Sequence, residues 1–206
     1  TQFPSFLKRA EEEFGVPSLE VDAPFGVEAS LAFYRRVAEA METPAEELTA
    51  LERLAKPYRK LVADALPGFE SLSLGYNLCS IVDFSMRPNT RLGLPDLKVF
   101  EELGFDVEFL YQGDQRKAHL ARVGRVVSEA GFDHPVCGFK DTFLLSPLLK
   151  ERGYDLTYCA DFLVGQARGT DTGFLRLHSL EPGLSATEHN IKRIRAALDA
   201  RSTRND

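Results

Sequence analysis

The sequence is poor in the side chains that usually hold metal clusters. It has three cysteines and four histidines among 206 residues. Cys79, Cys137 and Cys159 lie far apart, so no two of them have the spacing of a zinc or iron–sulfur motif. This stretch of sequence therefore does not encode a cluster site by itself. The small, odd number of cysteines also argues against a disulfide scaffold and favours a reducing compartment, the cytoplasm.

An excess of positive charge and a long hydrophobic run are also missing. The net charge is −6, which argues against nucleic acid or an anionic membrane as a partner, because phosphate binding needs a basic face. No apolar run approaches the roughly 18–20 residues that span a bilayer. The first four residues, TQFP, lack the apolar region of a signal peptide. Because the chain does not begin with methionine, we expect a fragment of a longer protein.

The composition that remains is typical of a globular protein, and its first third has helical patterns. Hydrophobic residues make up 44% of the chain and charged residues 27%. Residues 1–68 are predicted to be a helical segment that completes or links a preceding domain. Within it we expect a helix over residues 4–14, a brief strand over residues 16–21, and a helix with Thr43 as N-cap and Pro44 at its first position.

Residues 69–200 alternate between strand and helix patterns. The predicted strands are residues 71–74, 106–111, 134–139, 156–160 and 174–177. Regular alternation predicts an α/β fold with a doubly wound, mainly parallel, five-stranded Rossmann-like sheet. Right-handed connections favour a strand order such as 3-2-1-4-5. Residues 201–206 are predicted to be a frayed tail.

Ligands of such sheets bind at the carboxyl ends of the strands, where the loops gather. The first loop, residues 75–80, contains the candidate Asn77. It is not a G-x-G-x-x-G motif, which disfavours dinucleotide binding. After the third strand, Asp141 is positioned as a helix N-cap, and Lys140 beside that helix N-terminus is a candidate for binding an anion.

The last two strands end in stronger candidates. Asp161 lies in the loop of residues 159–169, at a strand end and just ahead of a polar, glycine-containing segment. Cys159, just before it, is more often an inert buried side chain than a ligand. His178 ends the last strand, where an imidazole can hydrogen-bond, move a proton or bind a metal. The alternative for His178 is a helix-capping or solvated loop histidine, and spacing alone does not decide between these and a functional role.

Several stretches together resemble the C-terminal half of the nitrogenase component 1 family. This family includes the molybdenum–iron protein subunits, their cofactor-assembly scaffolds, and dark-operative protochlorophyllide reductase-like subunits. The stretches that carry the resemblance are EEFGVP (12–17), PFGVEASL (24–31), KPYRK (56–60), FEELGFDV (100–107), YDL (154–156) and FLRLHS (174–179). Their order and spacing extend over nearly the whole chain.

The resemblance implies redox chemistry by a multi-subunit metalloenzyme or by its assembly scaffold. It implies a paralogous partner subunit, an ATP-dependent iron–sulfur reductase as electron donor, and an iron–sulfur or metal cluster in the intact protein. In the family's α subunits the histidine of the FLRLHS-like strand ligates the metal cofactor, so His178 is the implied metal ligand. Asp161, Lys140 and Asn77 are further candidates for cofactor binding.

Two departures from the family pattern restrict this expectation. The family's cofactor-anchoring cysteine would fall just before residue 1, and the segment at residues 180–184 is shorter and plainer than in the α subunits. We therefore expect this chain by itself to be inactive and to hold no cluster. The substrate stays open between dinitrogen, a tetrapyrrole precursor and a cofactor precursor.

Two other functions fit the same sequence. One is a Rossmann-like module without redox chemistry that binds a nucleotide or small anion at residues 75–80, Lys140 and residues 165–169. The other is an interaction subunit whose apolar helical stripe, residues 31–66, packs on a partner.

Overall fold

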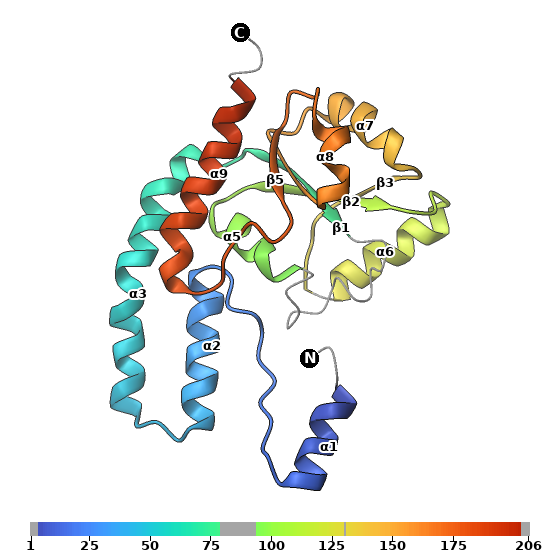
Figure 1. Cartoon of the computed structure of the whole chain (residues 1–206). Helices are drawn as coiled ribbons and strands as arrows, with labels where there is room; N and C mark the ends of the chain where they lie inside the picture. The colour runs from blue at the N-terminus through green and yellow to red at the C-terminus, as the bar shows by residue number, and fades with distance from the viewer. Residues whose placement is uncertain (1–3, 79–93, 130, 203–206) are drawn as a thin grey trace.

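The computed structural model describes residues 4–78, 94–129 and 131–202, and its centre is a five-stranded parallel sheet (Figure 1). The strands are β1 (Ser73–Leu78), β2 (Asp106–Gln112), β3 (Val136–Phe139), β4 (Leu156–Cys159) and β5 (Gly173–Arg176). Their order is β3-β2-β1-β4-β5, and every neighbouring pair is parallel. The predicted doubly wound α/β fold is therefore confirmed.

Helices cover both faces of the sheet, each over its own apolar cluster. One face carries α5 (Leu97–Glu102), α6 (Lys117–Glu129) and α9 (Thr187–Ser202), whose side chains pack on alternate strand residues such as Phe109 and Leu175. The other face carries α7 (Leu145–Arg152) and α8 (Val164–Ala167) over the intervening residues. Burial on both faces explains apolar runs such as residues 109–111 of β2.

The helical N-terminal part packs against the sheet domain through a helix hairpin. Helices α2 (Val27–Ala40) and α3 (Ala45–Ala65) lie side by side, and α3 also packs on α9 (Figure 1). Leu31 is fully buried, so at least this part of the apolar stripe covers the protein's own core. The carboxylate of Glu102 accepts hydrogen bonds of 2.8 and 2.9 Å from the backbone N–H groups of Val27 and Glu28. This side chain supplies acceptors to the start of α2 and joins it to the end of α5.

Gly26, directly before α2, makes that contact possible. Its φ of 82° lies in the left-handed region, and a Cβ there would lie 2.8 Å from the Glu102 carboxylate. A larger residue would both strain the backbone and push this carboxylate away.

The structure corrects two predictions in the N-terminal part. Helix α1 (Pro4–Phe14) has the predicted bounds, but residues 16–21 form no strand. No strand of the described residues pairs with them, and Pro17 has no N–H to donate. Pro44, rather than Thr43, is the N-cap of α3, with an extended ψ of 143° and no side-chain cap hydrogen bond.

Short 3-10 helices lie in connections between the main elements of the described chain. They are η1 (Leu66–Gly68), η2 (Leu94–Asp96), η3 (Thr142–Leu144), η4 (Asp161–Leu163) and η5 (Leu184–Ala186). The sequence predicts a loop over residues 161–167, but these residues form η4 and the short helix α8. In the described parts of the chain, the helices are too short or too polar for any of them to cross a membrane.

The end of α9 is held in place, which corrects part of the predicted frayed tail. Arg201 forms an ion pair with Asp155 at the start of β4, and Asp155 also accepts 2.8 Å hydrogen bonds from the backbone N–H and hydroxyl of Ser73. Although partial burial opposes it, hydrogen bonding from Ser73 and Arg201 lowers the pKa of Asp155. Residues 203–206 lie outside the described part.

Gly173, the first residue of β5, is predicted to be intolerant of any side chain. A Cβ at this position would lie 2.6 Å from the carbonyl oxygen of Ala197 in α9. Because this obstacle is backbone, Gly173→Ala should force β5 and α9 apart and lower the free energy of unfolding by about 1–3 kcal/mol. Urea denaturation monitored by circular dichroism measures this change.

The matched control is Gly124→Ala in the middle of α6. No atom lies within 4 Å of a Cβ built at Gly124, so the substitution should raise helix propensity and stabilise the protein by about 0.5–1 kcal/mol. Equal effects of the two substitutions would show that the approach of α9 to β5 is looser than described.

Candidate functional site

The carboxyl ends of β4 and β5 form the corner of the sheet where two candidate residues come together. Asp161 follows β4 and His178 follows β5, and these strands are neighbours. Lys140 follows β3, which is three strand positions from β4 in the sheet order. At about 4.8 Å per strand, that separates the ends of these strands by roughly 14 Å. The candidates thus divide into a β4–β5 corner and a separate Lys140.

The turn after β5 presents the His178 side chain to solvent on a fixed backbone. The residue has a φ of 66°, in the left-handed region, where histidine is one of the few tolerated side chains. The Ser179 N–H donates to the Arg176 carbonyl at 3.1 Å, and the Leu177 N–H donates to the Cys159 carbonyl at 2.9 Å. The His178 N–H itself donates to the Tyr158 hydroxyl at 3.1 Å. The side chain is exposed, whereas its backbone is bonded to the core.

Beneath this turn lies a buried carboxylate that binds two tyrosines. Asp96, at the end of η2, has only 3% of its surface exposed. Its two carboxylate oxygens accept hydrogen bonds from the hydroxyls of Tyr76 in β1 and Tyr158 in β4. These tyrosines are paired in register across the two strands. The chain of bonds runs from Asp96 through Tyr158 to the backbone of His178.

Burial controls the electrostatics of this network. It raises the pKa of Asp96 to about 6, although the tyrosine hydrogen bonds and the positive charge of a protonated His178 act in the opposite direction. Burial and the neighbouring Asp96 charge raise the pKa of Tyr76. Tyr76 therefore stays protonated near neutral pH, and its hydroxyl, like that of Tyr158, donates to the carboxylate.

Asp161 is more weakly held than His178. It is the first residue of η4, and its side chain is 75% exposed. Its only ion pair among the described contacts is to Arg176, with 3.7 Å between Oδ1 and Nε. A pair this exposed contributes little to stability, so Asp161 is free to change partners.

Asn77 lies inside β1, not in a loop. The strand continues to Leu78, beyond its predicted end at Leu74, and Asn77 is 96% buried on the face opposite Tyr76. Its side-chain N–H donates to the Leu110 carbonyl at 3.2 Å. This bond joins one of the two side-chain N–H groups of Asn77 to the neighbouring strand β2. The remaining predicted loop residues, Cys79 and Ser80, lie outside the described part.

Lys140 is exposed at the other end of the sheet. Asp141 is the N-cap residue of η3, as predicted, although its side chain makes no cap hydrogen bond. Nothing in the described contacts joins Lys140 to the β4–β5 corner.

A metal site needs several donor side chains that converge on one point. No group of three or more histidine, cysteine or acidic side chains converges in residues 4–78, 94–129 and 131–202. Cys159 is fully buried in apolar surroundings, and burial raises the pKa of its thiol to about 12. It is therefore a poor ligand, as its inert interpretation predicted. His178 fits the role of a single imidazole ligand to a group held mainly by other residues.

Sequence reasoning missed Asp96 and its two tyrosines. The sequence places Asp96 between the predicted strands and Tyr76 in a predicted loop, so no local pattern indicates that they meet. Only the register between β1 and β4 places both hydroxyls over one carboxylate.

We predict a pH-dependent destabilisation from Asp96. Its folded-state pKa, about 6, lies above its unfolded value near 4, so the folded state holds the proton more tightly. The stability of the wild type relative to Asp96→Asn should therefore fall as pH rises from about 4 to 6, by about 1.4 kcal/mol per pKa unit of separation, and then level off. Urea titrations at several pH values measure this difference.

Asp64→Asn is the control, because Asp64 is an exposed carboxylate paired with Lys60 on α3. This variant retains Asp96 and should keep the wild-type pH slope. A difference between wild type and Asp96→Asn that is constant from pH 4 to 7 would contradict the raised pKa.

Comparisons with known proteins show the fold and no more. No protein-family profile and no curated protein matches the sequence. Among solved structures, 28 chains match. One is "Nitrogenase Cp1 at pH 6.5", with a TM-score of 0.61 and 18% sequence identity over 97% of this chain. The match covers 43% of that nitrogenase chain, so this chain spans less than half its length. The protein has a nitrogenase-like α/β fold.

Proposed function

We propose that this chain is part of a nitrogenase-like oxidoreductase subunit, or of a scaffold on which such an enzyme's cofactor is assembled. The observation that carries the proposal is His178, an exposed imidazole on a fixed turn at the carboxyl corner of a nitrogenase-like sheet. That is the edge where open α/β sheets bind their ligands.

In this function the chain supplies one wall of a cofactor site. His178 would hold the metal group through its imidazole, and that group, when bound, supplies the redox chemistry. The left-handed turn fixes the backbone of His178, while Tyr158 and Asp96 fix the turn. Asp161 and Arg176, both exposed beside it, are available for polar groups of the same cofactor.

The other parts of the proposal come from the resemblance. A paralogous subunit and an ATP-dependent iron–sulfur reductase would be the protein partners, and the remaining cofactor ligands would come from outside this chain. By itself the chain would be inactive. Dinitrogen, a tetrapyrrole precursor and a cofactor precursor all remain compatible with a single histidine ligand.

The nucleotide-binding alternative finds no support at the first strand. A Cβ on Gly75 would meet Leu110 and Tyr154 side chains at 3.0 Å. This glycine therefore makes room for packing on a neighbouring strand, and no phosphate can approach it.

The test is anaerobic purification of the full-length gene product, with an iron assay and an absorption spectrum. We expect a coloured, iron-containing protein whose spectrum changes in His178→Asn. Asparagine tolerates the left-handed backbone, so this variant removes the imidazole while keeping the turn. His189→Asn on α9, an exposed histidine near Glu181, should leave iron content and spectrum unchanged.

A colourless, iron-free full-length protein would overturn the proposed function. If the protein contains iron but neither substitution changes its spectrum, the proposed enzyme class would stand. The proposed role of His178 as a cofactor ligand would then be wrong.

A further inference from the structure

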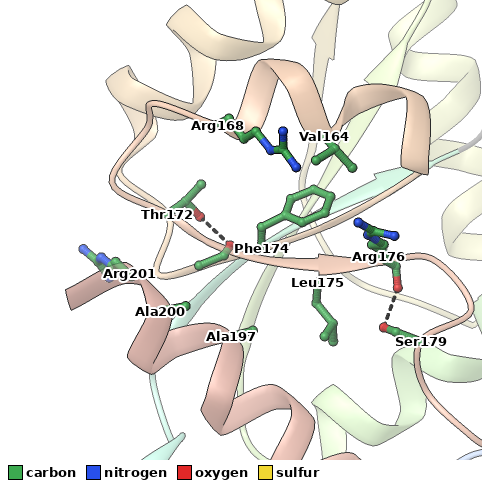
Figure 2. Close-up of a pocket in the computed structure, with 11 residues that line it drawn as sticks. Val164, Arg168, Thr172, Phe174, Leu175, Arg176, Ser179, Ala197, Ala200 and Arg201 are labelled. Atoms are coloured by element: carbon green, nitrogen blue, oxygen red, sulfur yellow. Dashed lines mark hydrogen bonds between the residues drawn. The ribbon is translucent and has the colours of Figure 1, made fainter. Parts of the chain in front are cut away.

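Strand β5 is the edge of the sheet, and a groove runs along its unpaired side (Figure 2). The groove encloses a cavity of about 370 Å³. Its floor is the strand itself, and its walls come from both helical layers. Val164 of α8 and Arg168, the residue that follows this helix, line one side. Ala197, Ala200 and Arg201 of α9 line the other. A cavity lined from both layers lies in the plane of the sheet.

That is the place where a sixth strand would lie. The common doubly wound order is 3-2-1-4-5-6, and the described sheet ends at β5. We propose that the groove binds an extended, acidic segment of a partner protein, which adds to β5 as a sixth strand.

The backbone of β5 has the groups that such a strand needs. The N–H groups of Gly173 and Leu177 donate to β4, to the carbonyls of Asp155 and Cys159 at 2.9 Å. Because bonding direction alternates along a parallel strand, the N–H groups of Phe174 and Arg176 and the Phe174 carbonyl face the groove. Main-chain bonds to these groups would provide the affinity of strand addition.

The charge of the groove selects the partner. Arg168 and Arg176 lie on the same side of β5 as the Phe174 ring, and Leu175 points to the opposite side (Figure 2). Arg176 shares only the long contact to Asp161, and no acidic residue in the described ranges forms an ion pair with Arg168. Glutamate or aspartate at alternate positions of an added strand would meet these two arginines.

The same charges disfavour a second copy of this chain as the occupant. Pairing of β5 with β5 would bring the Arg168 and Arg176 side chains of both copies together, and like charges across such an interface are costly. The proposal does not depend on His178 or on any cofactor.

The test uses a labelled peptide of sequence Ac-Thr-Glu-Val-Glu-Val-Glu-Thr-amide and the same peptide with lysine in place of glutamate. Fluorescence anisotropy should show binding of the acidic peptide with a Kd below the order of 1 mM, and much weaker binding of the basic one. NMR-detected hydrogen exchange should show new protection at the Phe174 and Arg176 amides. Leu175 and Leu177, which already bond to β4, should change little.

Charge reversal distinguishes peptide binding in the groove from non-specific electrostatic attraction to the protein surface. The double variant Arg168→Glu/Arg176→Glu should weaken binding of the acidic peptide at least about tenfold. Arg125→Glu, an exposed position on α6, is the control and should retain the wild-type affinity.

Three results would overturn the proposal. If the acidic peptide does not bind, the arginines would serve only to prevent β5 from pairing with other strands. Binding without protection of the Phe174 and Arg176 amides would mean electrostatic attraction without strand addition. Protection of these amides at high protein concentration without peptide, together with dimerisation in light scattering, would identify a second copy as the occupant.

Discussion

The buried carboxylate of Asp96 is the contact on which the centre of this structure depends. A carboxylate in apolar surroundings is costly unless donors surround it. Here the donors are the hydroxyls of Tyr76 and Tyr158, so the same bonds that solvate Asp96 hold β1, β4 and η2 together. Loss of either hydroxyl would leave a buried charge partly unsatisfied. The network therefore constrains the relative positions of two adjacent central strands and the segment that leads into α5.

The network also extends to the surface. Tyr158 donates to Asp96 and accepts from the His178 N–H, so the buried carboxylate orients a hydroxyl that in turn holds the exposed turn. A left-handed residue outside glycine costs about 1 kcal/mol or more, and tertiary bonds of this kind retain it. Preorganisation of this sort is what a ligand position requires, because a side chain on a loose loop would lose affinity in being ordered.

Much of the fold could be predicted from the sequence because its patterns are local. Strand–helix alternation after residue 69 fixes a parallel sheet, and glycines such as Gly104 and Gly153 end helices in the left-handed conformation. The strand predicted over residues 16–21 is wrong because an extended pattern forms a strand only where a neighbouring strand can pair with it. The loop predicted over residues 75–80 is wrong at Asn77, because Gly75 lies within β1, where its missing side chain leaves room for the side chains of Leu110 and Tyr154. The network of residues 76, 96 and 158 could not be predicted from the sequence, because its contacts depend on the register between strands, which no local pattern encodes.

The two surfaces of interest meet in one residue. The Arg176 carbonyl accepts from the N–H and hydroxyl of Ser179 and so closes the turn that presents His178. The Arg176 N–H faces the groove, and its side chain lies between the groove and Asp161. A strand added to β5 would therefore immobilise the residue that closes the His178 turn, and it would compete with Asp161 for the guanidinium. The edge and the corner of this sheet are physically coupled through the last residue of β5.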